Sequence, residues 1–131
     1  MAGTSPQTPQ PLSAALSDLA RALDAPRGEG LELGRWRWTV RQRMAALRDA
    51  LLREDAGSPE VWLDARYGAA RRERDGLLTR LAALGPRVLE EPQVERTRKD
   101  LTRLVVDVSH HRQRLHDLAY DDVEIELGGS E

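Results

Sequence analysis

Residues 94–118 constrain the fold most, because they follow a coiled-coil repeat over four heptads. One core position of the repeat is taken by Val94, Leu101, Val108 and Leu115, and the other by Thr97, Leu104, His111 and Leu118. All but the histidine are apolar or threonine, a pattern typical of long helices that pack lengthwise against others. The repeat predicts a helix over residues 92–120.

Apolar seams with helical spacing occur in three earlier segments. The spacing predicts a helix over residues 35–56, with a core face formed by Trp36, Val40, Met44, Leu47 and Leu51. Ser58-Pro59-Glu60 has the N-cap, first-turn proline and early acid of a helix start, and Gly85-Pro86 is a stop signal, so we expect a helix over 59–85. A shorter amphipathic helix is predicted over 12–25, with an apolar face formed by Leu12, Ala15, Leu16, Leu19 and Leu23.

Short connections between long helices make neighbouring helices antiparallel. We therefore expect an all-α fold: an antiparallel three-helix bundle of residues 35–56, 59–85 and 92–120, with the short N-terminal amphipathic helix 12–25 added to it. Residues 1–11 are interpreted as a disordered leader, 12–120 as a single domain and 121–131 as an acidic C-terminal tail.

Two short segments alternate apolar and acidic residues with the period of a half-buried strand. These are residues 31–33 and 123–127. We interpret them as an ordinary loop and an extended tail, with short β-strands as the alternative.

Composition narrows the function classes. The 131 residues are 40% hydrophobic and 32% charged with a net charge of only −2, which is typical of a soluble globular protein rather than a general nucleic-acid binder. Cysteine is absent, which excludes disulfides, thiolate metal sites and cysteine nucleophiles. No signal peptide or membrane span is recognisable, so we expect a cytoplasmic protein without membrane contact.

The three histidines do not form a metal or catalytic pattern. His110, His111 and His116 are separated by one, five and six residues, whereas a helical two-histidine site needs a separation of four. We expect His111 to lie in the seam and pair with Asp107, four residues earlier. No nucleophile and base can be paired from the sequence, so we predict a protein that is not an enzyme and has no metal or cofactor.

An arginine and tryptophan cluster is the sharpest local feature. Residues 35–48 hold five arginines and no acid, and the candidate interaction residues there are Arg35, Trp36, Arg37, Trp38, Arg41 and Arg43. Interleaved arginine and tryptophan can stack on bases and neutralise phosphates. Nucleic-acid binding is therefore the alternative function, with a buried Trp36 and solvated arginines as the structural interpretation.

A second charged block balances the first. Residues 121–131 hold five acids and no base, and the interaction candidates there are Asp121, Asp122, Glu124 and Glu126. In an antiparallel bundle this block and the arginine cluster lie at opposite ends. We hypothesise that the two blocks pair, by folding back within one chain or across an antiparallel homodimer.

Tyr120 and Glu124 form a Y-x-x-x-E pattern at the end of a long helix. This resembles the C-terminal signal of type VII secretion substrates, which are small helical hairpins, and implies a secreted helical protein as a second alternative. Those proteins carry Trp-x-Gly in the interhelical turn, whereas the corresponding candidates here are Ala56-Gly57-Ser58-Pro59 and Gly85-Pro86.

Several apolar residues lie off the main seams and either widen the core or leave an apolar patch for a partner. They are Trp38, Leu52, Trp62, Leu78 and Val105. Because each polar feature suits surface recognition, the sequence favours a non-catalytic helical protein–protein interaction module that binds another protein or a second copy of itself.

Overall fold

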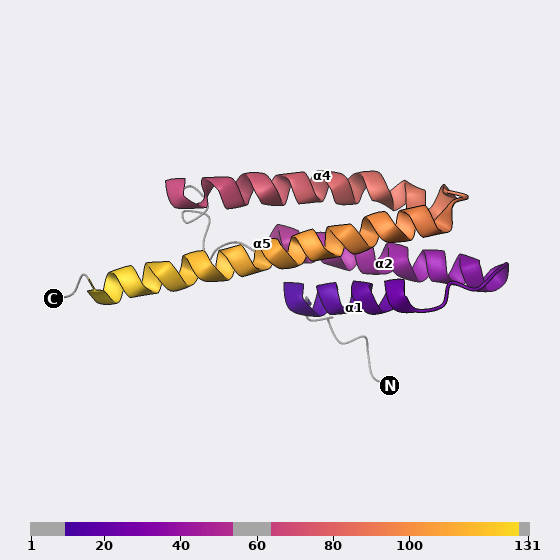
Figure 1. The fold of residues 1–131 in the computed structure, drawn as a ribbon, viewed down its shortest axis with the longest axis horizontal. Coiled ribbons are helices and arrows are strands. Elements are labelled where there is room, and N and C mark those ends of the chain that lie inside the picture. Colours follow the sequence, from indigo (N-terminus) through magenta and orange to yellow (C-terminus); the bar gives the residue numbers. More distant parts are fainter. Residues whose placement is uncertain (1–9, 54–63, 129–131) are drawn as a thin grey trace, which may run out of the picture.

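The computed structural model describes residues 10–53 and 64–128, and side chains as far as Asp121. These residues form α1 (Leu12–Asp24), α2 (Leu31–Arg53), a 3-10 turn η1 (Ala65–Tyr67), α4 (Gly68–Glu90) and α5 (Val94–Gly128), as Figure 1 shows. No strand occurs within these described ranges. The fold is an all-α helical bundle, as the sequence predicts.

Each helix packs against two others. α1 contacts α2 and α5, and α4 contacts α2 and α5, so the short first helix is a full member of the bundle. Every apolar seam residue predicted for α1 and α2 is buried, including Leu19, Val40, Met44 and Leu47, which have no exposed surface. The continuous core formed in this way is the main source of the bundle's stability.

The heptad prediction for α5 is confirmed. Seven of its eight seam residues are buried, and Leu118 packs half-buried in a second, smaller cluster with Tyr67, Ala70 and Leu115. This cluster lies where α4 and α5 continue beyond the end of α2 (Figure 1). The hairpin of α4 and α5 therefore extends past the four-helix part of the molecule.

The start predicted for the second helix is wrong by four residues. Leu31-Glu32-Leu33 forms the first turn of α2, so both the loop interpretation and the strand alternative for 31–33 are wrong. Gly28 and Gly30 adopt positive φ angles of 64° and 58°, which bring the chain sharply from α1 into α2. Half-buried Leu33 packs against the core, which favours an earlier N-terminal start of α2.

The third predicted helix, 59–85, differs from the structure at both ends. The Ser58-Pro59 start lies outside the described residues. A continuous helix from residue 59 is wrong, because Asp64 is extended and caps η1 by accepting a hydrogen bond from the Arg66 backbone. Hydrogen bonds from the side chain and backbone of Arg66 lower the pKa of Asp64 to about 2. The predicted stop at 85 is also wrong, since α4 passes through Pro86 to Glu90.

Burial of a side chain beyond Pro86 favours the continuation of α4. Proline removes one helical hydrogen bond, but Val88 is buried in the core. Gly85 also leaves room for Arg41 of α2, whose Cζ would lie 3.3 Å from a Cβ at that position.

α5 is longer than the predicted helix of 92–120. Its backbone stays helical to Gly128, so the strand alternative for 123–127 is wrong, and residues 121–128 extend the helix instead of forming a separate tail. Residues 1–9 of the predicted leader lie outside the described residues. Among the described helices, none combines the length and the apolar composition needed to cross a bilayer.

Candidate interaction surface

Trp36 of α2 has a structural role, because it contacts the C-terminal end of α1. Its indole Nε1 donates to the Ala22 carbonyl at 2.9 Å, and the Arg98 guanidinium lies 5.7 Å from its ring centroid. Arg98 donates from Nε to the Leu23 carbonyl at 2.6 Å and from Nη2 to the Ala25 carbonyl at 2.7 Å. Together the two side chains cap the C-terminal carbonyls of α1.

Arg37 does the same for α4. Its Nη1 donates to the Val88 carbonyl at 2.8 Å and its Nη2 to the Glu91 carbonyl at 2.9 Å. A guanidinium at a helix C-terminus satisfies free carbonyls and opposes the negative end of the helix dipole. Trp36 and Arg37 therefore both have structural roles: Trp36 holds α1 against α2, and Arg37 holds α4 against α2.

The remaining arginines of the cluster point to different sides of α2. Arg41 packs against Gly85 of α4. Arg43 is exposed. Hydrogen bonds from Gln10 and Arg21 lower the pKa of Asp18 in α1, and the charges of Arg21 and Arg43 lower it further. Arg35 is exposed. The structure thus does not bring the predicted cluster together on one surface.

An exposed apolar stripe follows the outer face of α2. It is formed by Leu31, Trp38, Ala45 and Leu52, each seven residues from the next. Leu31 is 84% exposed, Trp38 59% and Leu52 50%, and Ala45 is also exposed. The core-facing side chains of α2 lie on the opposite side of the helix. We call these four residues the α2 stripe.

Sequence reasoning found only part of the stripe. Trp38 and Leu52 were identified as off the seams and are exposed, whereas Leu78 and Val105 pack against the core. Trp62 lies outside the described residues. Leu31 was missed because the helix was expected to begin later, although its seven-residue spacing from Trp38 is a usable signal.

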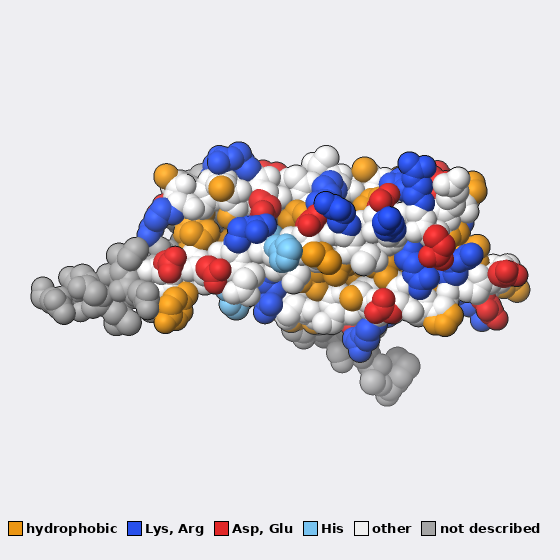
Figure 2. Space-filling model, in the orientation of Figure 1, with side chains coloured by type: hydrophobic (Ala, Val, Ile, Leu, Met, Phe, Trp, Pro, Cys, Tyr) orange, Lys and Arg blue, Asp and Glu red, His pale blue; other side chains and the backbone are white. Residues whose placement is uncertain are grey.

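A ladder of ion pairs joins α4 to α5 with a seven-residue repeat on both helices. Arg87 pairs with Asp100 and Arg80 with Asp107, each at 2.8 Å. Glu73 pairs with Arg114, so the polarity reverses at the third step. In Figure 2, basic and acidic side chains accordingly interleave on the face where α4 and α5 meet. These pairs suit only one antiparallel register of the two helices.

His111 lies in the seam as expected, but its partner is Glu73 and not Asp107. The His111 Nδ1 lies 2.7 Å from Glu73 Oε1, and His111 is 1% exposed. Burial raises the pKa of Glu73, but hydrogen bonds from Arg114 and His111 outweigh it and leave the pKa below its ordinary value. In the ranges 10–53 and 64–128, no three potential metal ligands lie together.

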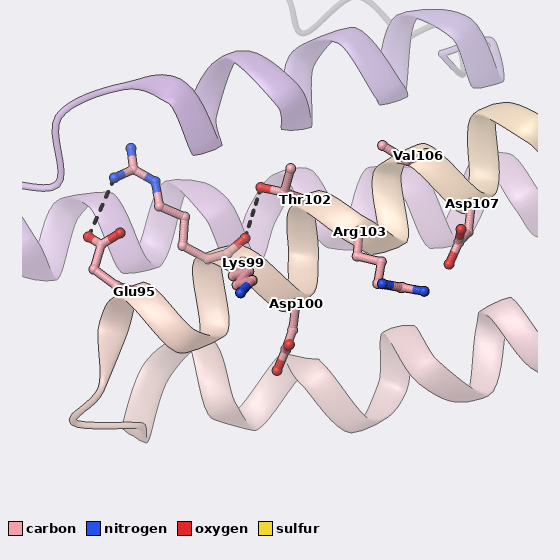
Figure 3. A pocket seen from close by; sticks show the side chains of 8 residues that line it. Glu95, Lys99, Asp100, Thr102, Arg103, Val106 and Asp107 are labelled. Atoms are coloured by element: carbon pink, nitrogen blue, oxygen red, sulfur yellow. Dashed lines mark hydrogen bonds and ion pairs between the residues drawn. The ribbon is translucent and has the colours of Figure 1, made fainter.

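Shallow grooves follow the surface of α5. The one in Figure 3 has a volume of about 820 Å³ and is lined only by α5 residues, with Val106 among charged neighbours such as Lys99 and Arg103. Its dashed contacts are internal to α5: Arg98 with Glu95, and the Thr102 hydroxyl donating to the Arg98 carbonyl. A groove of this kind offers mixed charge without a convergent polar centre.

The acidic candidates lie at the far end of the molecule from the start of α2 (Figure 1). Asp121 is exposed near the end of α5, and the side chains of Asp122, Glu124 and Glu126 lie outside the described ones. Tyr120, from the Y-x-x-x-E pattern, is 66% exposed. Pairing between the acidic block and the arginine cluster stays a prediction.

Comparisons with protein-family models, with curated proteins and with solved structures find no match to this chain.

Proposed function

We propose that the protein is a non-catalytic helical interaction module of the cytoplasm that acts by binding another protein, a second copy of itself included. The α2 stripe is the observation that supports this function. Isolated exposed apolar residues are common, but four in line along one helix form an apolar stripe that a partner helix can cover. A heptad spacing is also the one by which helices engage other helices.

Affinity capture from extracts of the native cell tests this function. The baits are the unaltered protein, a stripe double variant (Trp38→Glu, Leu52→Glu) and a control, Val106→Glu. Val106 is 46% exposed on α5, so the control introduces a glutamate at a similarly exposed apolar position, with one added charge against two in the double variant. We expect a protein, identified by mass spectrometry, that the unaltered chain and the control retain and the double variant loses. Identical capture by all three baits would contradict the proposal.

Light scattering with and without a short single-stranded oligonucleotide separates the alternatives. Self-association is expected to persist in salt and to ignore the oligonucleotide, because apolar contacts are little screened. A chain that shifts in mass only with the oligonucleotide, with steep salt dependence, would favour nucleic-acid binding instead.

A further inference from the structure

We infer that the α2 stripe binds an acidic amphipathic helix of another protein. This inference rests on the proposed function and adds the chemistry and geometry of the partner. It is carried by three features of α2: the spacing of the stripe, the alternation of side-chain size along it and the charge on its flanks.

The spacing selects a helix as the occupant. A strict seven-residue repeat drifts by about 20° per heptad around a straight α-helix. A partner helix follows that drift by crossing at about 20°, as in left-handed coiled coils. From Leu31 to Leu52 the stripe spans about 30 Å at 1.5 Å per residue, which matches a partner of three heptads.

The size alternation constrains the partner's side chains. Trp38 is the largest residue of the stripe and Ala45 the smallest. Close packing therefore calls for a small residue opposite Trp38 and a large one opposite Ala45. Gly34, between Leu31 and Trp38, has nothing of the described chain within 4 Å of where its Cβ would stand, so a partner helix can approach there.

The flanking charge makes the partner acidic. The basic residues that flank the stripe are Arg35 and Arg53 on one side and Arg41 and Arg48 on the other. Two acids, Glu32 and Asp49, lie beside them, so the flanks stay basic overall. Arg48 lies 3.7 Å from Asp49, yet its side chain is 59% exposed, so most of the Arg48 side chain is accessible to a partner. An antiparallel second copy would set Ala45 opposite Trp38, but it would also bring Arg41 against Arg41 of the copy. A helix flanked by glutamates would instead meet the arginines with opposite charge.

Binding of designed peptides tests the inference. The probe is a fluorescent three-heptad helix with leucines at the core positions, alanine opposite Trp38 and glutamates on both flanks; its control carries lysines on the flanks. We expect the acidic peptide to bind at least about tenfold more tightly than the basic one, and Trp38→Glu to weaken it at least about tenfold. Val106→Glu should bind like the unaltered protein.

A charge-reversed variant should gain binding to the basic peptide, a result that misfolding of the variant cannot produce. Arg35→Glu with Arg48→Glu changes only exposed side chains, and it should prefer the basic peptide. Any of four results would overturn the inference. Both peptides could bind equally well, or Trp38→Glu could leave binding unchanged. An oligonucleotide could displace the peptide, or the protein could form a dimer that Trp38→Glu dissociates. If the peptides fail but capture still depends on the stripe, the partner's chemistry is wrong and the proposed function stands; if both fail, the function fails too.

Discussion

Replacing Arg37 should destabilise the fold far more than replacing Arg35, although both arginines lie in the same charged run. Arg37 donates to the carbonyls of Val88 and Glu91 at 2.8 and 2.9 Å and is half-buried between α2 and α4. Arg35 is exposed. The variants Arg37→Met and Arg35→Met each remove one positive charge from the same end of α2, so their difference isolates the two hydrogen bonds.

The expected cost follows from those two bonds. A hydrogen bond from a charged donor contributes about 1.5–3 kcal/mol. Both carbonyls lie near a helix end where water partly replaces the lost donor, so we expect Arg37→Met to lower the free energy of unfolding by about 2–3 kcal/mol in total. Arg35→Met should change it by less than about 0.5 kcal/mol. Arg37→Lys should fall between, because an ammonium lacks the planar fork that reaches two carbonyls.

Urea denaturation followed by circular dichroism measures these differences. Equal effects of Arg37→Met and Arg35→Met would refute the structural role of Arg37.

Three further results are expected. Gly28→Ala should cost at least about 1–2 kcal/mol for its positive φ. The cost should exceed that of Gly30→Ala, because a Cβ at 28 also collides with the Glu32 side chain while that at 30 meets open space; thermal melts compare the two. A double-mutant cycle on Arg80 and Asp107 should give a coupling of about 0.2–1 kcal/mol that 1 M salt largely removes, and zero coupling at low salt would argue against the register. The folded-state pKa of Glu73 lies below its unfolded value, so its stabilisation is present above about pH 4.5 and is lost as the pH falls through the folded pKa. Glu73→Gln should accordingly flatten the acid side of the stability profile, and an unchanged profile would contradict the pairing.

The helices and their core faces could be predicted because each depends on periodicity within one segment. The seams of α1, α2 and α5 all face the core as expected. Helix ends were less predictable, since they depend on tertiary contacts. Pro86 is normally a stop signal, but burial of Val88 and the Arg37 cap carry α4 four residues beyond it.

Side-chain partners between helices could not be derived from the spacing within one helix. Asp107 is a suitable neighbour for His111 along α5, yet the register of α4 places Glu73 at the histidine and Arg80 at the aspartate. The arginine cluster misled for a related reason. Adjacent residues on a helix point about 100° apart, so Trp36, Arg37 and Trp38 serve three different surfaces.

Photocrosslinking in the native cell tests the function of the α2 stripe most directly. A benzophenone amino acid is placed at position 38 on the stripe, or at position 106 on the outer face of α5 as the matched control. We predict a discrete crosslinked protein from position 38 that position 106 does not give. Crosslinking that is absent at position 38, or the same at both positions, would contradict the claim that this face of α2 is a protein-binding surface.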